Sequence, residues 1–169
     1  MKDIKYSVDY HKQRTVSKGI SYRALRRIQE IQTAIRTRNL QHDYLLDIGT
    51  ADGFLLEKIS AKVKVGIDIS FDLLKLNKHH PLCASALYLP FKDKSFDMVI
   101  ASALLAHVKD PLQVLKGIYR VLKNGGHLLV VSPSPLFVHT ATMVGYLKKD
   151  SLNRPYSINQ IKKLLNKSD

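Results

Sequence analysis

The segment that most constrains the fold is Leu45–Phe54, in which an apolar run contains Asp47 and enters a turn with Gly49 and Gly53. The apolar run predicts a buried strand, and a helix is expected after the turn. In an open parallel sheet, ligands bind beyond the carboxyl ends of the strands. Gly49 lets the backbone approach a ligand closely, and Gly53 allows a tight entry into the helix. The segment therefore predicts a ligand site, with a plain strand–turn–helix unit as the simpler alternative.

The glycine spacing distinguishes between cofactors. A dinucleotide-binding turn beginning at Gly49 needs glycine at 51 and glycine or alanine at 54, where this chain has Ala51 and Phe54. The phosphate-binding P-loop is absent because no Gly-Lys-Ser/Thr follows. A second acid, Asp68, lies 19 residues after Gly49 at the end of the next predicted strand, where a carboxylate can bind ribose hydroxyls. Its alternative role is a helix cap or a surface acid.

Strand and helix signals alternate along the chain. We expect strands over 44–48, 63–67, 83–87, 97–101 and 127–132, and helices over 20–39, 54–60, 71–77, 111–123 and 157–166. Ser70, Asp110 and Ser157 are the expected caps of the last three helices. This order predicts an α/β fold in which a mainly parallel, doubly wound sheet carries helices on both faces.

The helix over 20–39 carries much of an unusual positive charge. Its residues Leu25, Ile28, Ile31 and Ile35 line one face, and its arginines lie largely off that face. The chain has 27 Lys and Arg against 14 Asp and Glu, a net charge of +13. Such a charge indicates RNA, a membrane surface or an acidic substrate as partner, or only a solvated basic surface.

Composition limits the class of protein. Cys83 is the only cysteine, so the chain can form neither an internal disulfide nor a multi-cysteine metal site, and no metal is expected. Residues 1–10 lack the apolar region of a secretory signal. The longest mostly apolar stretch, 98–108, is too short to span a bilayer. We therefore expect a soluble cytoplasmic protein.

Two further motifs complete a family pattern. Leu89-Pro90-Phe91 is followed by Asp93 and by Ser95-Phe96-Asp97, and Leu122–Leu128 contains a glycine turn before the last predicted strand. Together with the two acidic segments, these motifs resemble the class I S-adenosylmethionine-dependent methyltransferases, particularly those acting on small molecules. The resemblance covers residues 43–132 and the last helix. It implies a Rossmann-like sheet of order 3-2-1-4-5, S-adenosylmethionine as cofactor and a small-molecule acceptor.

The resemblance also implies roles for individual residues. The methionine end of the cofactor would contact Asp47, Gly49, Thr50, Ala51, Asp52 and Gly53. Asp68 would bind the ribose, Ile69 would pack on the adenine, and Ser85 and Ala86 would face the adenine amino group. Ser85 departs from the aspartate that the family often has there, and its hydroxyl brings no negative charge. Ala101 and Ser102 would line the floor near the sulfonium.

His107 is the only candidate general base, because an unperturbed histidine titrates near neutrality. Its alternative role is packing in a loop near the cofactor. A base is needed only when the acceptor must lose a proton. The absence of a recognisable catalytic triad therefore does not exclude methyl transfer, in which the cofactor carries the leaving group.

We expect a single domain over 1–169, with a basic helical extension over 1–40, the cofactor-binding core over 43–132 and an acceptor-side segment with the last helix over 133–169. Strands six and seven of the family have no counterpart before Asp169. The strand over 127–132 is then expected to be an apolar sheet edge that promotes self-association. Two alternatives to a small-molecule methyltransferase remain: an RNA methyltransferase that uses the basic surface, and a truncated cofactor-binding module without turnover.

Overall fold

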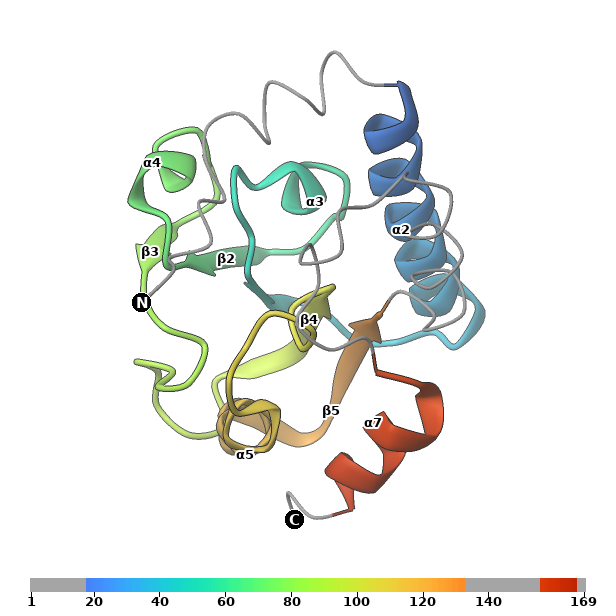
Figure 1. Cartoon of the computed structure of the whole chain (residues 1–169), viewed down its shortest axis with the longest axis vertical. Helices are drawn as coiled ribbons and strands as arrows, with labels where there is room; N and C mark the ends of the chain where they lie inside the picture. The colour runs from blue at the N-terminus through green and yellow to red at the C-terminus, as the bar shows by residue number, and fades with distance from the viewer. Residues whose placement is uncertain (1–17, 133–155, 167–169) are drawn as a thin grey trace.

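The computed structural model describes residues 18–132 and 156–166, and Figure 1 shows the order of their helices and strands. These elements are α2 (Lys18–Thr37), β1 (Tyr44–Ile48), α3 (Phe54–Glu57), β2 (Val63–Asp68), α4 (Phe71–Leu74), β3 (Pro81–Cys83), β4 (Phe96–Ser102), α5 (Pro111–Val121), β5 (Leu122–Val131) and α7 (Ile158–Leu165). Most of the predicted acceptor-side segment, residues 133–155, lies outside the described residues. None of the described helices is long and apolar enough to cross a lipid bilayer.

The five strands form one parallel sheet in the order β3-β2-β1-β4-β5, which confirms the predicted topology. β1 lies at the centre, between β2 and β4. β4 is buried along nearly its whole length instead of alternating between core and solvent, as expected of a parallel strand covered on both faces. The described residues contain no strand beyond β5, which forms an edge of the described sheet.

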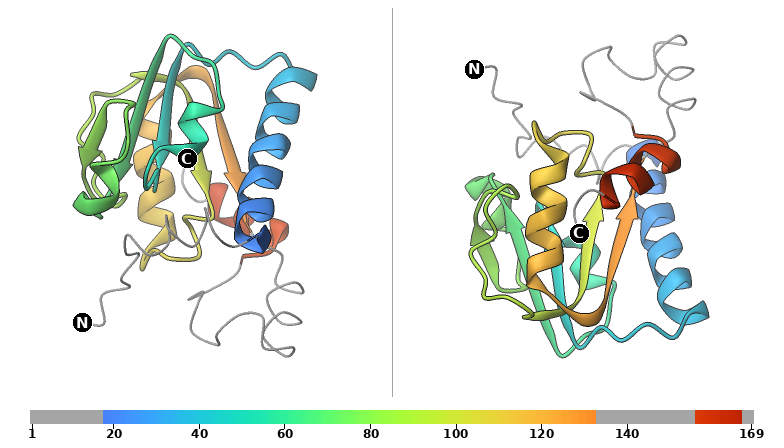
Figure 2. Two further views of the ribbon diagram at one scale, coloured as in Figure 1. Left: turned by 90° about the horizontal axis from the view of Figure 1, so that it is seen from above. Right: turned by 90° about the horizontal axis from the view of Figure 1, so that it is seen from below.

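Helices cover both faces of the sheet, so the fold is doubly wound as predicted (Figure 2). Alternate residues of each strand point to opposite faces. On one face, residues of α2 and α3 pack with β1 and β4 in a cluster formed by Ile31, Leu45, Leu56, Ile59, Met98 and Ile100. On the other face, α5 and α7 pack over the neighbouring strand residues, among them Leu46, Ile48, Val99, Val114, Leu115, Ile118 and Ile161. The core thus has two apolar layers that hold the sheet rigidly between them.

The third strand differs from its prediction. It spans Pro81–Cys83, where the sequence predicts 83–87. Residues 85–88 form a turn instead: the Ser85 hydroxyl accepts a hydrogen bond from Leu87 N at 3.2 Å, and Ser85 O accepts one from Tyr88 N at 3.1 Å. A serine side chain that bonds the backbone two residues on competes with strand pairing. The predicted strand over 83–87 is therefore wrong beyond Cys83.

The first two short helices end earlier than predicted. α3 ends at Glu57 instead of 60, and α4 ends at Leu74 instead of 77. In each case the chain tightens into bonds between residues three apart, from Lys58 N to Leu55 O and from Asn77 N to Leu74 O. Such 3₁₀-type turns are common where an α-helix ends.

The junction of α5 and β5 also differs from its prediction. α5 ends at Val121, and β5 begins at Leu122 rather than at His127. The pairing of β5 with β4 begins with Phe96 opposite Leu122 and shifts register before Met98. The glycine turn after Lys123 therefore lies within the strand as an irregularity, in place of the loop expected between helix and strand.

Two of the three predicted helix caps are confirmed. The Asp110 carboxylate accepts a hydrogen bond from Gln113 N at 3.0 Å, and Ser157 forms a capping box with Gln160. Ser70 occupies the cap position of α4, but its side chain makes no capping bond.

The inward face of α2 is rotated relative to the predicted stripe. Ile28 and Ile31 are buried, with 5% and 1% of their surface exposed, but Leu25 is 43% exposed. Arg27 lies four residues before Ile31 and is half-buried. Residues four apart occupy the same face of a helix. The stripe that faces the sheet therefore continues into an arginine and not into Leu25.

Candidate functional site

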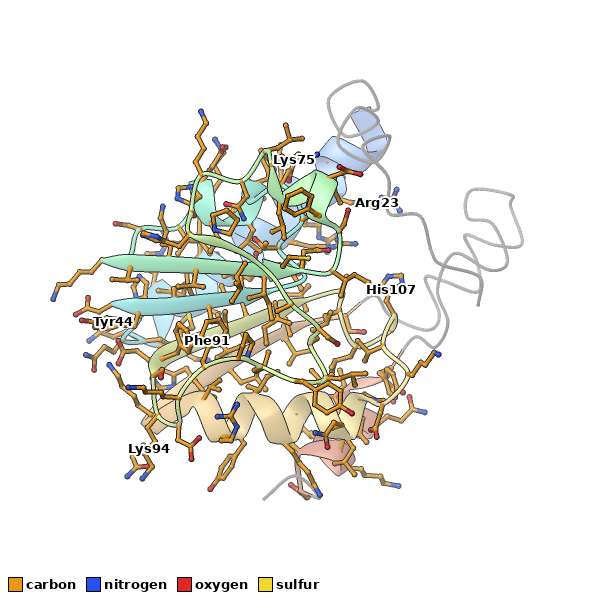
Figure 3. The ribbon with its side chains drawn as sticks, turned by 90° about the vertical axis from the view of Figure 1, so that its left-hand side faces the viewer. Arg23, Tyr44, Lys75, Phe91, Lys94 and His107 are labelled. Carbon is orange, nitrogen blue, oxygen red and sulfur yellow. The ribbon has the colours of Figure 1, made fainter. Side chains whose placement is uncertain are left out.

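The predicted site residues meet at the carboxyl edge of the sheet. From β1 the chain passes to β2 on one side, and it later enters β4 on the other side of β1. The carboxyl end of β1 is therefore the point where the strand order reverses, which is where open α/β sheets bind their ligands. Figure 3 shows His107 and Arg23 at this end of the strands, with Tyr44 and Lys94 at the opposite end.

The turn after β1 is tied to the neighbouring strand through its backbone. The N–H groups of Gly49 and Thr50 both donate to the carbonyl oxygen of Ile67, at 2.8 and 3.0 Å. Gly49 and Gly53 have φ angles of 78° and 77°, a left-handed conformation that suits glycine. Ala51 has a φ of 51°, which is strained for a residue with a Cβ. Backbone strain of this kind concentrates at functional sites.

Asp68, at the end of β2, holds this strained turn. Its Oδ2 accepts a hydrogen bond from Ala51 N at 2.9 Å, and its Oδ1 accepts one from Ser70 N at 2.8 Å. The second bond stabilises the start of α4. Asp68 therefore also has the alternative role of an acid at the start of a helix. A carboxylate has about four acceptor positions, and two backbone donors leave room for ribose hydroxyls. Asp68 therefore joins the glycine turn to the predicted ribose position.

Asp47, the acid of β1, is buried with only 2% of its surface exposed. Burial raises the pKa of its carboxyl group to about 7, the nearby charge of Asp68 also raises it, and a hydrogen bond from the Thr50 side chain opposes the rise. A carboxyl group in this state becomes a stable carboxylate when a cation lies beside it. This is a property expected of a residue that binds the positively charged methionine end of the cofactor.

Asn77, which is not among the predicted site residues, lies next to the turn. Its side chain is buried, its Oδ1 accepts a hydrogen bond from His79 N at 2.8 Å, and its Nδ2 donates to Thr50 Oγ1 at 3.4 Å. An amide nitrogen only donates, so the Thr50 hydroxyl accepts there and keeps its own proton for Asp47. Asn77 thus sets the direction of the hydrogen bonds that reach the buried carboxyl group.

Two glycines make room for the Asn77 side chain. A Cβ on Gly53 would lie 2.4 Å from Asn77 Oδ1, and a Cβ on Gly66 would lie 2.7 Å from both Asn77 Nδ2 and Thr50 Cγ2. Glycine inside a strand commonly marks a close approach of other groups. Gly66, within β2, is therefore the sequence signal that could have indicated a side chain packed against this turn.

The residues predicted to meet the adenine lie at the ends of β2 and β3. Ile69 is 74% exposed, an unusual position for a branched apolar side chain two residues after the buried Ile67. The Asp68 carbonyl oxygen accepts a hydrogen bond from Ala84 N at 3.0 Å, which fixes the end of β3 beside β2. Ser85 and Ala86 follow there and are half-buried, and Ala86 packs against the core. Ile69 and Ser85 are thus available to a ligand, whereas Ala86 is partly committed to packing.

At the end of β4, the two predicted floor residues differ. Ala101 is fully buried and packs in the core. Ser102 is half-buried and pairs with Val131 at the last position of the ladder. The following residue, Ala103, has a φ of 58° and donates its N–H to Val131 O at 2.6 Å. Of the two predicted floor residues, Ser102 is the one that keeps exposed surface at the carboxyl end of β4.

His107 belongs to a turn that lies against the glycine turn. Its N–H donates to Leu104 O at 2.9 Å, and a Cβ on Gly49 would lie 3.2 Å from Leu104 Cδ1. Burial lowers the pKa of His107, and the positive charge of Arg27 lowers it further. The imidazole is therefore neutral at pH 7, the form that can accept a proton.

Acidic groups surround the glycine turn although the whole chain carries a net charge of +13. Asp47 and Asp52 are buried beside it, and the half-buried Asp68 binds Ala51 N. S-adenosylmethionine carries positive charge on its sulfonium and its amino group, so these residues fit that cofactor. Within the described ranges, no group of three or more His, Cys, Asp or Glu side chains is placed to hold a metal ion.

The opposite edge of the sheet has a structural role. A hollow of about 270 Å³ there is lined by Gln41, Asp97, Lys123, Asn124, Gly125 and Gly126. Asp97 accepts hydrogen bonds from Tyr44 N at 2.9 Å and from Lys123 Nζ at 2.8 Å. Burial raises the pKa of Asp97, but these two bonds and the positive charges of Lys123 and Lys62 together outweigh it, and the pKa lies below its ordinary value. This acid of the Ser95–Asp97 motif therefore fixes the starts of the central strands, away from the site.

The chain matches the methyltransferase domain family over residues 46–130. A malonyl-[acyl-carrier protein] O-methyltransferase from Marinomonas sp. is 35% identical over 101 residues, covering 53% of this chain and 37% of that protein. A ubiquinone/menaquinone biosynthesis C-methyltransferase from Haemophilus ducreyi is 42% identical over 79 residues, covering 46% of this chain and 30% of that protein. The chain thus spans less than half the length of these curated relatives.

A solved structure shows the same architecture. The crystal structure of an S-adenosylmethionine-dependent methyltransferase from Thermotoga maritima superposes with a TM-score of 0.75 at 24% identity, covering 97% of this chain and 77% of that chain. At this identity the likeness concerns the fold alone. The family match includes the end of β1 and all of β2 and β4, together with Asp47, the glycine turn and Asp68. The chain therefore belongs to the methyltransferase domain family and has the class I fold of its S-adenosylmethionine-dependent members.

Proposed function

We propose that the chain transfers a methyl group from S-adenosylmethionine to a small-molecule acceptor. The observation that carries this proposal is the strained glycine turn at the carboxyl end of β1, held by Asp68 through Ala51 N at 2.9 Å. The turn brings a buried acid and a half-buried acid together at the strand-order reversal. A cationic cofactor with a ribose matches that combination better than an anionic dinucleotide does.

In this proposal each part of the cofactor meets residues of a different turn. Asp47 and the turn from Gly49 through Thr50, Ala51 and Asp52 to Gly53 hold the methionine end. Asp68 accepts hydrogen bonds from the ribose hydroxyls. Ile69 packs on the adenine, and the Ser85 hydroxyl faces the adenine amino group beside Ala86. Support comes from the exposed side chain of Ile69 and from the acceptor positions that the two backbone donors leave on Asp68.

The cofactor supplies an activated methyl group, so the chain's own work is positioning and the exclusion of water. Ser102 lies at the edge where the acceptor approaches, while Ala101 supports that edge from the core. His107 is neutral at pH 7 because burial and Arg27 lower its pKa. A neutral imidazole can take a proton from an acceptor hydroxyl or amine, which is the role of base that the proposal gives to His107.

A small-molecule acceptor is favoured by the relatives, which are named for methylation of malonyl-[acyl-carrier protein] and of ubiquinone or menaquinone precursors. The basic helix α2 supports RNA as the alternative acceptor. A cofactor-binding module without turnover is the third hypothesis. Incubation with labelled S-adenosylmethionine and four acceptor classes (malonyl thioesters, quinols, amines and tRNA) separates the three, because a module without turnover labels none of them.

Calorimetry tests the cofactor site. We expect S-adenosylmethionine and its demethylated product to bind in preference to NAD, and Asp68→Ala to weaken that binding about ten- to a hundred-fold, since hydrogen bonds to a charged acceptor are worth about 1.5–3 kcal/mol. Asp72→Ala is the matched control, because Asp72 is an exposed acid whose ion pair with Lys75 lies on the surface. A folded protein that binds neither ligand would refute the proposed function, and equal affinity in both variants would refute the ribose assignment.

A further inference from the structure

Helix α2 runs antiparallel to the strands, so its two ends lie at opposite edges of the sheet. Its last residue, Thr37, leads through residues 38–43 into the start of β1 at the amino edge. Ile31 packs in the middle against Leu45, Met98 and Ile100. A helix of 20 residues is about 30 Å long, whereas a five-residue strand spans only about 17 Å. The N-terminal turns of α2 therefore reach the level of the carboxyl edge (Figure 2).

The face of α2 that lies against the sheet becomes basic where it reaches that edge. Arg27 and Arg23 precede Ile31 by four and eight residues on the same face, and both are half-buried. Arg26 differs: its side chain is 66% exposed and pairs with Glu30 at 3.2 Å. Within residues 18–132 and 156–166, no carboxylate lies at ion-pair distance from Arg27.

Arg27 lies close enough to His107 for its charge to act on the imidazole. Figure 3 shows Arg23 and His107 at the same end of the molecule. His107 follows Ser102 by five residues in the loop after β4, and that loop contacts Gly49 through Leu104. The carboxyl edge thus has acidic groups around the glycine turn and basic groups on α2, and the His107 loop contacts the glycine turn.

We propose that Arg27 binds an anionic group, a carboxylate or a phosphate, on the methyl acceptor beside His107. This inference rests on the proposed function and specifies its acceptor class. A half-buried guanidinium that has no carboxylate partner among the described residues gains stability when an anion joins it, and its planar donors match carboxylate and phosphate alike. The acidic groups of the edge receive the cationic cofactor, and the basic groups receive the anionic acceptor.

The test uses inorganic phosphate and malonate as probes on the full chain, with the demethylated cofactor bound. The reporter is the His107 imidazole, followed by NMR titration and assigned with His107→Gln. We expect either anion to raise the pKa of His107, because it neutralises Arg27. In Arg27→Gln, the pKa of His107 should be raised already without anion, and anion affinity should fall about ten-fold or more, as for a lost charged hydrogen bond. Arg27→Lys should keep part of the response.

Arg26→Gln is the matched control, since it removes the same charge one residue away on the solvent face. It should leave the anion response unchanged. The stronger of the two probes indicates whether the acceptor group is a phosphate or a carboxylate. No response in the unaltered chain, or an equal response in Arg27→Gln, would overturn the proposal.

Calorimetry with S-adenosylmethionine on the same variants separates this inference from the proposed function. All three arginine variants should bind the cofactor with unchanged affinity. If the unaltered chain does not bind the cofactor, the proposed function itself is refuted. If it binds the cofactor but shows no anion response, only the acceptor class is refuted. Salt-sensitive tRNA binding that falls equally in Arg26→Gln and Arg27→Gln would also overturn the proposal, because it would indicate a diffuse RNA track along α2.

Discussion

At the scale of single residues, Asp47 combines deep burial with a position at the centre of the candidate site. Its carboxyl group receives a hydrogen bond from the Thr50 side chain, and Asn77 Nδ2 orients that hydroxyl from 3.4 Å away. Burial nevertheless raises the pKa to about 7. Without a ligand, the folded chain therefore holds a proton on Asp47 at pH values where an ordinary carboxyl group has lost it.

We predict that cofactor affinity rises with pH up to about pH 7 and is level above it. A cation bound beside Asp47 favours the carboxylate, so binding below that pH must release a proton and weakens by up to about ten-fold per pH unit. Calorimetry in buffers of different ionisation enthalpy measures this proton release. Asp47→Asn should flatten the profile, and Asp72→Asn should leave it unchanged. Proton release that persists in Asp47→Asn would assign the titration to another group.

The raised pKa of Asp47 affects fold stability in the opposite direction: cofactor affinity rises with pH, whereas the free energy of unfolding falls. Between its ordinary value of 3.8 and about 7, the carboxyl group of Asp47 binds more protons in the folded chain than in the unfolded chain. The contribution of Asp47 to the free energy of unfolding therefore declines as pH rises through this window. The cofactor should reduce this decline, because it supplies the missing countercharge.

At the scale of elements, the site depends on how tightly the glycine turn packs against the turn that follows α4. Gly53 lies directly against the Asn77 side chain, whereas Gly125, in β5, has open space where a Cβ would be. The two glycines have nearly equal φ angles, 77° and 75°. An alanine substitution at each of the two glycines therefore compares two sites that have the same backbone conformation and differ in the space available to a Cβ.

We predict that Gly125→Ala lowers the free energy of unfolding by about 1–2 kcal/mol, the cost of a left-handed residue with a Cβ, without changing cofactor affinity. Gly53→Ala should cost more and should weaken cofactor binding, because its Cβ would lie 2.4 Å from Asn77 Oδ1. Chemical denaturation and calorimetry measure the two effects. In a double-mutant cycle, Asn77→Ala should partly rescue Gly53→Ala, and strict additivity would show that the two residues do not interact.

At the scale of the whole molecule, a net charge of +13 is combined with an apolar strand at the edge of the described sheet. β5 contributes Leu128, Leu129, Val130 and Val131, all half-buried. Like charges keep copies of the chain apart, but an unpaired strand edge promotes pairing between copies. Salt screens the repulsion between like-charged copies much more than it weakens pairing at the strand edge.

We therefore keep the prediction that the chain self-associates through residues 127–132 and add that salt promotes it. Sedimentation velocity at about 0.02 and 0.5 M salt should show larger species at the higher ionic strength, where the Debye length is only a few ångströms. Leu129 and Val130 both pack against the core, so backbone pairing is tested with Val130→Pro, and Val130→Ala controls for the lost core packing of that side chain. A monomer at all concentrations in both buffers would contradict the prediction.

Local signals in the sequence (hydrophobic runs, caps and the glycine turn) were enough to predict the alternating strands and helices, the parallel sheet and the place of the candidate site, whereas the strand order was an expectation from the family resemblance. Contacts between distant residues were decided only by the tertiary structure. Asn77 reaches Thr50 across 27 positions of the sequence, and Arg27 acts on His107 from a different element. The inward rotation of α2 follows from where Ile28 and Ile31 find the core, not from the helical period alone. Packing also set the pKa of Asp47, since it excludes water from a carboxyl group that the sequence only locates.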